Sequence, residues 1–245
     1  MSEIRLTNFF KQFIHTYAKI LTTSLDLLFP RHCFGCGREK TRLCSRCLAN
    51  LPRSFCSGEE KIFSVFDYNS PIIKQAIWAL KYKRGIDLAE TFARAMSDTL
   101  FEELADELVL PSRTDLKAPQ GRSLMPITLI PVPLSKKRFR ERGYNQAEEL
   151  AKQMVALNPE QFVIETSLVK KVKDTPTQVS LRDRAKRLAN LKGAFEVANW
   201  PLASSNTIFV IIDDVSTTGT TIGEIRRLLR EAGYYRVYGL VLAHG

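Results

Sequence analysis

The chain has 245 residues, of which 44% are hydrophobic and 25% are charged. These fractions exclude disordered and fibrous proteins, and the length allows one core with a small appendage. The formal net charge of +10 favours anionic partners such as phosphates, nucleotides, nucleic acid or a membrane surface, although solubility alone also explains such a charge.

Residues 1–30 carry apolar side chains at helical spacing, interrupted by Lys11, His15 and Lys19. This pattern lacks the unbroken apolar stretch of a membrane span and the short apolar core of a signal peptide. We therefore expect an amphipathic helical segment that packs on the body of the protein. A helix bound to a membrane surface or to a partner is the alternative.

Residues 31–58 contain few aliphatic side chains but two Cys-x-x-Cys pairs, Cys33 with Cys36 and Cys44 with Cys47. Each pair places two sulfurs on a tight turn, as thiolates must lie to share one tetrahedral Zn²⁺. We expect a small structural zinc module here, because metal binding would supply the folding free energy that a hydrophobic core cannot. The pairs are closer together than in common zinc fingers, so a redox dithiol stays open for one of them.

The sequence has five cysteines. An odd number argues against a disulfide framework, and the paired thiols indicate a reducing compartment, so we expect a cytoplasmic protein. Two further candidate metal ligands, His32 and Cys56, are expected to be bystanders.

Residues 59–245 alternate between strand-like and helix-like segments. Strands are predicted at 62–68, 127–132, 162–172, 194–197, 208–212 and 237–242, and helices at 70–80, 87–108, 145–157 and 222–232. A surface loop is expected at 111–125, and a basic loop before the helix at 145–157. The β-branched run at 208–212 is typical of a central strand in a parallel sheet. The order predicts an α/β domain with a mainly parallel sheet flanked by helices.

Two carboxylates and a threonine-rich turn follow the strand at 208–212. The acids, Asp213 and Asp214, come one and two residues past the strand, and the turn contains Thr217, Thr218, Gly219, Thr220 and Thr221. Open α/β sheets bind ligands at the carboxyl ends of their strands, and a turn that opens a helix offers backbone N–H groups to a phosphate. We expect the turn to bind a sugar 5-phosphate and the acids to accept hydrogen bonds from the ribose hydroxyls. An acidic turn that merely caps a helix would explain only part of this string.

Five cationic side chains lie in the basic loop after the strand at 127–132. They are Lys136, Lys137, Arg138, Arg140 and Arg142. Guanidinium groups match phosphate oxygens in a bidentate way, so we expect this loop to bind a second anionic group at the same sheet edge. A solvated basic loop without a ligand is the alternative.

Residues 208–222 resemble the phosphoribosyl pyrophosphate (PRPP) motif of type I phosphoribosyltransferases, a hydrophobic strand followed by two acids and a threonine-rich glycine turn. The resemblance implies a phosphoribosyltransferase-like sheet that binds PRPP, with Mg²⁺ carried in on the pyrophosphate and the basic loop as the pyrophosphate site. Purine-salvage members have an Asp at the position of Thr217. This departure argues against a hypoxanthine or guanine substrate.

The run Arg-Glu-Arg-Gly-Tyr-Asn-Gln-Ala at residues 140–147 resembles the signature of the ComF family of competence-associated, phosphoribosyltransferase-like proteins. The likeness spans about residues 27–245 and includes an amino-terminal zinc ribbon. It implies a role in competence, in DNA uptake or in the use of DNA as a nutrient, with competence-machinery proteins as partners. Lys81 also resembles a family feature, although a lysine that opposes a helix dipole explains it equally well.

A basic insertion at about residues 170–193 separates two predicted strands. Type I enzymes carry a mobile hood there, and the family resemblance extends through this insertion. It implies a flexible lid over the sugar, formed by Gln178, Arg182 and Arg184 among others, that excludes water during transfer. A flexible basic arm would also bind the backbone of single-stranded DNA, and both uses stay open.

Two classes of function remain. As an enzyme, the chain would let a nitrogen nucleophile attack C1 of PRPP while pyrophosphate leaves under stabilisation by Mg²⁺ and cationic side chains. No general base stands out, so the catalytic residues stay unnamed and catalysis would rest on orientation and exclusion of water. As a binding module, the same fold would sense PRPP or bind single-stranded DNA.

Overall fold

The computed structural model describes residues 31–54, 61–82, 85–109, 126–173, 191–198 and 207–245. The chain divides into two compact units, Met1–Asn50 and Leu51–Gly245. The predicted amino-terminal helix, the predicted domain boundary near residue 58 and the predicted lid side chains Gln178, Arg182 and Arg184 all lie outside the described residues.

In the first unit, the described residues form a tight turn and one short helix, α2 (Ser45–Ala49). The N–H of Cys33 donates to the carbonyl oxygen of Arg38 at 2.8 Å. Gly37 has a φ of 72°, which glycine adopts without strain. Among the described residues of this unit, the buried apolar side chains are Cys33, Leu43 and Cys44. So small a cluster provides little hydrophobic stabilisation.

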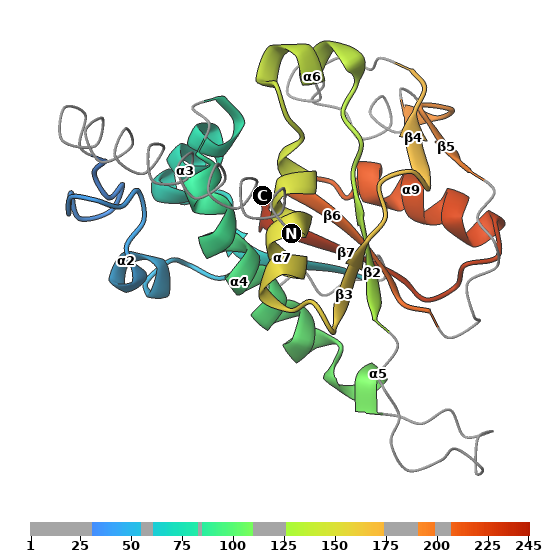
Figure 1. Ribbon diagram of the computed structural model, residues 1–245, viewed down its shortest axis with the longest axis horizontal. Helices are drawn as coiled ribbons and strands as arrows, with labels where there is room; N and C mark the ends of the chain where they lie inside the picture. Colours follow the sequence, from blue (N-terminus) through green and yellow to red (C-terminus); the bar gives the residue numbers. More distant parts are fainter. Residues whose placement is uncertain (1–30, 55–60, 83–84, 110–125, 174–190, 199–206) are drawn as a thin grey trace, which may run out of the picture. The chain divides into compact units, whose positions relative to one another are not determined.

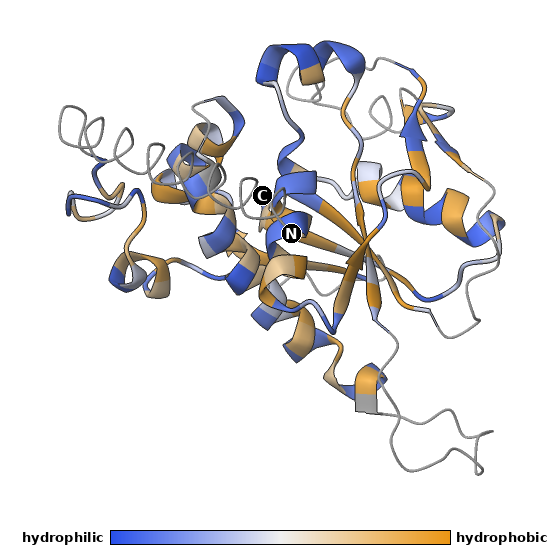
Figure 2. Ribbon diagram, in the orientation of Figure 1, coloured by the Kyte–Doolittle hydropathy of each residue, from blue (hydrophilic) through white to orange (hydrophobic). Residues whose placement is uncertain are grey.

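The second unit is built on a five-stranded sheet of order β1-β7-β6-β2-β3, in which neighbouring strands are parallel. The strands are β1 (Ile62–Asp67), β2 (Ile127–Pro131), β3 (Phe162–Ile164), β6 (Phe209–Ser216) and β7 (Val237–His244). The central strand β6 and its neighbour β7 are buried along most of their length, and most of the sheet is coloured as hydrophobic in Figure 2. The predicted mainly parallel α/β fold is confirmed.

Helices cover the sheet on both faces (Figure 1). On one side lie α3 (Pro71–Tyr82), α4 (Ile86–Glu103) and α7 (Gln146–Leu157), and on the other lies α9 (Thr220–Glu231). The apolar face of α9 packs Ile222, Ile225 and Leu229 into the core, where each buried side chain contributes about 1.5–3 kcal/mol. A short helix, α5 (Ala105–Val109), follows α4, so the helix predicted at 87–108 is interrupted at Leu104. Among the described helices, none has both the length and the apolar character needed to cross a bilayer.

Strand β6 is longer than the sequence predicted, because it continues through both acids to Ser216. Its extra residues pair with β7, in the register Asp213 to Val241 and Ser216 to His244. On the other side, β2 pairs as far as Pro131, opposite Ile212. The acids therefore lie within the strand and not past it, at the point where the pairing with β2 ends.

The prediction that the basic segment before α7 is a loop is also wrong. Most of that segment forms the helix α6 (Lys136–Arg142). The side chain of Ser135 caps this helix by accepting a hydrogen bond from the N–H of Arg138 at 3.4 Å. Gly143 ends it with a φ of 80°. The helix is strongly hydrophilic (Figure 2), so it has no apolar stripe from which a helix could be predicted.

The strand predicted at 162–172 is divided into β3 and β4 (Val169–Lys171). Between them, the carboxylate of Glu165 accepts hydrogen bonds from the N–H groups of Ser167 at 2.6 Å and Leu168 at 3.2 Å. Strand β4 pairs antiparallel with β5 (Phe195–Val197). The predicted pairing across the basic insertion is therefore confirmed for β4, whereas β3 belongs to the main sheet.

Candidate functional site

A cavity of about 680 Å³ lies at the carboxyl ends of β2 and β6; we call it the main cavity. The chain leaves β2 towards α7 and β3, and it leaves β6 in the opposite direction, towards α9 and β7. Such a switch point is where open α/β sheets bind ligands. The topology alone therefore marks this edge of the sheet as the candidate site.

Both predicted acids line the main cavity. Asp214 is 8% exposed, and its Oδ2 lies 3.0 Å from Nζ of Lys81, near the end of α3. Oδ1 of Asp213 accepts a hydrogen bond from the N–H of Asp214 at 2.8 Å. Successive side chains of a strand point to opposite faces, and both can reach one cavity here because the pairing with β2 has ended.

The surroundings of Asp213 favour the protonated form of its carboxyl group. Burial raises the pKa of Asp213 to about 7, and the charge of Asp214 acts in the same direction. The N–H of Asp214 and the charges of Lys81 and Lys171 lower that pKa, but they do not outweigh the burial. A cation or a hydroxyl donor beside Asp213 would favour its ionised form, as expected of a carboxyl group that meets a ligand.

The threonine-rich turn joins β6 to α9 and is shaped by two of its own residues. The buried hydroxyl of Ser216 accepts a hydrogen bond from the N–H of Gly219 at 3.1 Å. Gly219 has a φ of 70° and immediately precedes α9, so a larger residue would be strained there. The N–H of Gly219 is thus engaged inside the turn, whereas the first turn of a helix generally leaves N–H groups available to an anion.

The structure brings two of the predicted threonines to the acids. Thr217 and Thr221 line the main cavity together with Asp213 and Asp214. The hydroxyl oxygens of Thr218 and Thr220 lie 3.1 Å apart, and these two residues contribute to the shape of the turn.

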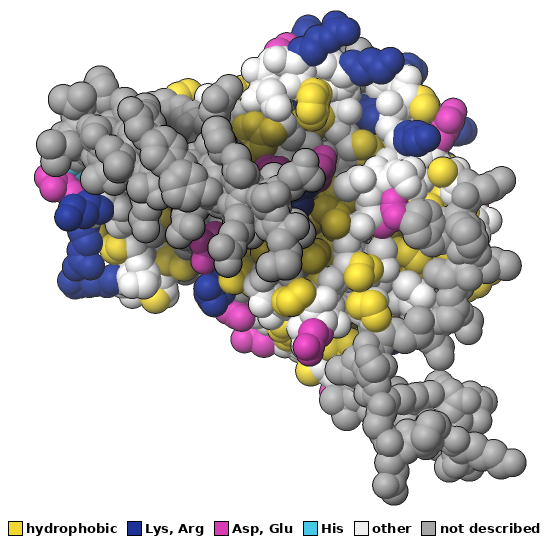
Figure 3. Space-filling view, viewed as in Figure 1, with side chains coloured by type: hydrophobic (Ala, Val, Ile, Leu, Met, Phe, Trp, Pro, Cys, Tyr) yellow, Lys and Arg dark blue, Asp and Glu magenta, His cyan; other side chains and the backbone are white. Residues whose placement is uncertain are grey.

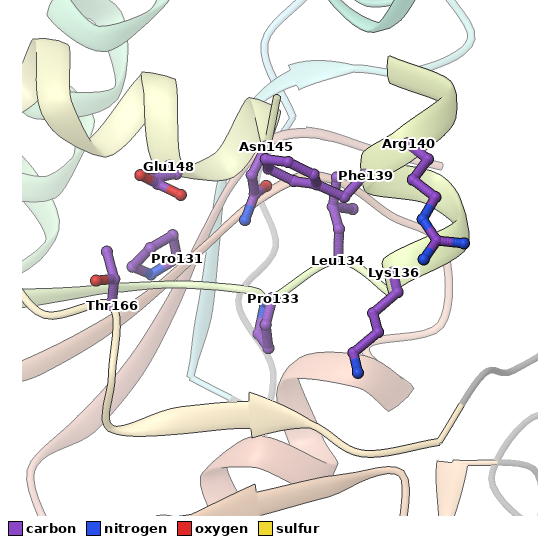
Figure 4. Close-up of a pocket in the computed structure, with 9 residues that line it drawn as sticks. All are labelled: Pro131, Pro133, Leu134, Lys136, Phe139, Arg140, Asn145, Glu148 and Thr166. Carbon is purple, nitrogen blue, oxygen red and sulfur yellow. The ribbon is translucent and has the colours of Figure 1, made fainter. Parts of the chain in front are cut away.

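Four of the five predicted cations of α6 are divided between two cavities. Arg138 and Arg142 line the main cavity. Lys136 and Arg140 line a second cavity of about 350 Å³, shown in Figure 4 together with Phe139. Lys137 is exposed. Helical spacing explains the division, because 136 and 140 lie on one side of α6, and 138 and 142 on another.

Figure 3 shows Lys and Arg side chains gathered where α6 lies in the view of Figure 1. The predicted concentration of positive charge at this edge is therefore present. Of the four cations that line a cavity, two line the main cavity with the acids and two line the second cavity.

Contacts made by residues 140–147 explain why this run has its particular side chains. The amide oxygen of Gln146 accepts a hydrogen bond from Arg142 at 2.7 Å. The hydroxyl of Tyr144 donates to the carbonyl oxygen of Leu80 on α3. The side chain of Asn145 caps α7 and donates to a carbonyl oxygen at the end of β2 at 3.0 Å. The run therefore fastens α6 and α7 to their neighbours and orients one of the arginines that line the main cavity.

Sequence reasoning missed two aromatic residues of α3 that line the main cavity, Trp78 and Tyr82. The guanidinium carbon of Arg142 lies 5.4 Å from the ring centre of Tyr82. The helical period of α3 contained the signal, because the buried residues Ile73, Ala76 and Leu80 occupy a different face.

In the first unit, the four predicted cysteines form one cluster. Each offers its sulfur, and the four sulfurs lie within 4.8 Å of one another. The sulfurs of Cys36 and Cys44 are 3.7 Å apart, close to the edge of about 3.8 Å that a tetrahedron with zinc–sulfur bonds of about 2.3 Å would have. These four cysteines could hold a structural metal ion such as zinc.

Backbone N–H groups lower the pKa of Cys33 and Cys44, whereas the neighbouring cysteines raise the pKa of Cys47. The N–H of Cys44 donates to the sulfur of Cys33 at 3.4 Å. Burial raises the pKa of Cys33, but hydrogen bonds from the backbone N–H groups of Cys36, Cys44 and Gly35 outweigh it, and the pKa falls to about 6. Thiolates are the form that binds metal. The cluster of described residues does not include His32, and Cys56 lies outside the described residues.

Comparison with known proteins finds relatives that match most of the chain, although no family model matches it. Competence protein F of Haemophilus influenzae is 31% identical over 226 residues, which cover 88% of this chain and 86% of the relative. DNA utilization protein YhgH of Salmonella typhi is 30% identical over 211 residues, covering 82% and 83%. Competence protein ComFC of Bacillus subtilis is 26% identical over 178 residues, covering 69% and 58%.

Proposed function

Because the chain belongs to the ComF family, we propose that it binds PRPP with Mg²⁺ in the main cavity and serves the uptake or use of DNA. The observation that carries the proposal is the meeting of acids, threonines and arginines in one cavity at the switch point of the sheet. The biological role rests on the relatives, whose names refer to competence and to DNA utilization.

Each part of PRPP has a matching group in the cavity. The 5-phosphate binds at the turn 217–221, where hydroxyls and helix N–H groups meet. Asp213 and Asp214 accept hydrogen bonds from the ribose hydroxyls. Arg138 and Arg142 bind the pyrophosphate, whose oxygens match guanidinium groups. This assignment leaves Lys136 and Arg140 to a different ligand.

Lys81 has two roles in this proposal. Without ligand, it neutralises the nearly buried Asp214 at 3.0 Å. When a ribose hydroxyl donates to that acid, the ammonium group is free to turn to the pyrophosphate. Mg²⁺ suits this site because it prefers carboxylate and phosphate oxygens, and it would neutralise charge on the pyrophosphate.

The same arrangement supports phosphoribosyl transfer. A bond would form between an acceptor nitrogen and C1 of the ribose while the bond from C1 to the pyrophosphate oxygen breaks, and that oxygen keeps the electron pair. The acceptor nitrogen would give up its proton to solvent. Arg138 and Arg142 would stabilise the charge on the departing pyrophosphate.

A binding module is the second candidate function, and the second cavity favours it. Phe139 is 50% exposed and lines the second cavity together with Lys136 and Arg140 (Figure 4). Exposed aromatic rings beside cations are typical of surfaces that bind single-stranded nucleic acid without sequence preference. On this proposal, α6 would hold a DNA strand on one side and PRPP on the other.

We also propose that the four cysteines of the first unit bind Zn²⁺ as a closed structural site. Four sulfur ligands leave no open coordination position. The described part of this unit has few buried apolar residues, so the metal would supply much of its folding free energy. A reducing compartment such as the cytoplasm would keep the thiolates available.

Isothermal calorimetry with PRPP and Mg²⁺ tests the proposed function. The variant Asp213→Asn with Asp214→Asn should lose PRPP binding, whereas Asp98→Asn, which alters an exposed acid of α4, should keep it. Tight binding retained by the double variant would contradict the assignment. Release of pyrophosphate with a panel of nitrogen acceptors would then separate the enzyme from the module, since a module would bind PRPP without turnover.

A further inference from the structure

The second cavity combines apolar and charged side chains (Figure 4). The apolar ones include two prolines, Leu134 and Phe139, and the charged ones are Lys136, Arg140 and Glu148. The volume of about 350 Å³ lies at the lower end of the range of small-molecule sites. The cavity therefore suits one small ligand that has both an apolar part and charged or polar groups.

Helix α6 contributes an aromatic ring and two cations to this cavity. Lys136, Phe139 and Arg140 have the spacing i, i+3 and i+4, which places them on one side of the helix. Phe139 is 50% exposed, so its ring is accessible to a ligand. An aromatic ring stacks with a nucleic-acid base, and ammonium and guanidinium groups bind phosphate oxygens. The three side chains together match the base and the phosphate of one nucleotide.

Helix α7 contributes a carboxylate to the same cavity. Glu148 lies in the first turn of α7, and its Oε1 is 2.8 Å from Nζ of Lys152, one turn further along the helix. Figure 4 shows Glu148 on the opposite side of Asn145 from Arg140. A carboxylate only accepts hydrogen bonds, and its charge repels a phosphate. Glu148 therefore matches an N–H donor on the base and not a second phosphate.

The four bases of DNA differ in what they offer to this carboxylate. Adenine, cytosine and guanine have exocyclic amino groups, whereas thymine has a carbonyl oxygen and a methyl group at the corresponding edge. The ring N–H of thymine is flanked by two carbonyl oxygens, which would approach the carboxylate oxygens with charge of the same sign. A base with an amino group is therefore favoured beside Glu148.

The second cavity and the main cavity use different cations. Lys136 and Arg140 line the second cavity, and Arg138 and Arg142 line the main cavity. A ligand in one cavity therefore leaves the cations of the other available. The two cavities can be occupied at the same time, by PRPP on one side of α6 and by a second ligand on the other.

We propose that the second cavity binds one nucleotide, with its phosphate on Lys136 and Arg140 and its base stacked on Phe139. The amino group of the base donates a hydrogen bond to Glu148, so nucleotides of adenine, cytosine or guanine are preferred to those of thymine. The inference rests on the binding module of the proposed function and deepens it, because it gives that module a site and a base preference. A free 5′-mononucleotide and one unit of a single DNA strand offer the same groups.

Calorimetry with nucleotides tests the site. The chain is saturated with Mg²⁺ and PRPP to occupy the main cavity, and is then titrated with dAMP, dCMP, dGMP and dTMP. Short oligonucleotides of deoxycytidine and of thymidine form a second arm. We expect at least one amino-bearing nucleotide to bind about 10-fold more tightly than dTMP, the effect of one hydrogen bond to a charged group. Binding of the mononucleotides identifies a site for free nucleotides, and binding of the oligonucleotides alone identifies a site for a strand.

Variants of α6 locate the bound nucleotide. Phe139→Ala should lower its affinity by about 10-fold to 100-fold, the range for loss of one stacking contact, and Phe139→Tyr should keep most of that affinity. The double variant Lys136→Ala, Arg140→Ala should weaken the nucleotide but not the nucleoside, which has no phosphate. Lys137→Ala is the matched control, because Lys137 is an exposed cation of the same helix that lines neither cavity, and it should change the affinity by less than about twofold.

Glu148→Gln tests the base preference. The amide of Gln keeps the shape of the side chain but can donate to a carbonyl oxygen of thymine. The variant should therefore bind dTMP and the amino-bearing nucleotides with nearly equal affinity. A variant that still discriminates against dTMP as strongly as the unaltered chain would contradict the role of Glu148.

The outcomes separate this inference from the proposed function. If neither the nucleotides nor the oligonucleotides bind, or if they bind equally well to the variants of Phe139, Lys136 and Arg140, the second cavity is not a nucleotide site. Oligonucleotides that bind these variants unchanged would leave the binding module in place with its DNA surface elsewhere. Binding of PRPP is measured independently, so its absence would refute the PRPP assignment without removing a nucleotide site that the variants locate.

Discussion

Replacing Asp213 by Asn should stabilise the protein at alkaline pH while abolishing PRPP binding. Burial, with the charge of Asp214, raises the pKa of Asp213 from 3.8 to about 7 in the folded chain. Between these two values the unfolded chain loses its proton while the folded chain keeps it. The free energy of unfolding therefore falls as pH rises through this window, and the loss is complete above pH 7. The amide of Asn does not titrate in this pH range, so the stability of the variant does not fall in this way as pH rises.

The size of the effect follows from the pKa shift. About three pH units at 1.36 kcal/mol each set an upper limit of about 4 kcal/mol. Asp213 is only partly buried by surface area, so solvent would screen part of this energy. An Asn can still accept the hydrogen bond that the N–H of Asp214 now donates. We therefore expect Asp213→Asn to raise the free energy of unfolding by about 1–2 kcal/mol above pH 8.

Urea denaturation at pH 8.5 and at pH 4, with the Zn²⁺ concentration held constant, measures the effect. The gain should be present at the higher pH and should have nearly vanished at the lower one. Asp214→Asn gives the contrast, because it leaves the ammonium of Lys81 without its partner at 3.0 Å and should destabilise by about 1–3 kcal/mol. An Asp213→Asn variant less stable than the unaltered chain at pH 8.5, or a gain of equal size at both pH values, would refute the reasoning.

In calorimetry, the double variant Arg138→Ala, Arg142→Ala should lower the affinity for PRPP by about 10-fold to 100-fold and the affinity for ribose 5-phosphate much less. The double variant Lys136→Ala, Arg140→Ala should leave both affinities unchanged. Equal losses of affinity for the two ligands in the first variant would contradict the pyrophosphate role. PRPP binding near pH 7 should release protons as Asp213 ionises, so its calorimetric heat should depend on the ionisation enthalpy of the buffer, and a heat common to all buffers would contradict that. Removal of zinc with a chelator should abolish the structure of the cysteine cluster and leave the unfolding transition of the second unit in place, and loss of both would contradict a local role for the metal. The affinity for single-stranded DNA should fall steeply with salt, and a flat response would exclude α6 as an electrostatic DNA surface.

The elements that the sequence predicted well are those with their own apolar period. Helices α7 and α9 have stripes such as Ile222, Ile225 and Leu229 that bury one face, and local pattern is enough to find them. The end of β6 could not be predicted in this way. Aspartate is a poor strand former, and the pairing of Asp213 with Val241 depends on a strand that lies far along the chain.

Some residues of the candidate site lie next to one another in the sequence, and others come together only in the folded chain. Asp213, Asp214 and the threonines are contiguous, so one stretch of sequence reveals them together. Trp78 and Tyr82 come from a helix at the start of the second unit, and only the folded sheet brings them to the acids. The division of the α6 cations between two cavities depended on recognising a helix that has no apolar stripe.

A crystal structure of the chain with PRPP and Mg²⁺ would test the central claim most directly. We predict density for the 5-phosphate at the turn 217–221, with the ribose hydroxyls within hydrogen-bonding distance of Asp213 and Asp214. Density for PRPP only in the second cavity, beside Lys136 and Arg140, would contradict the account, as would a main cavity without ligand at saturating PRPP.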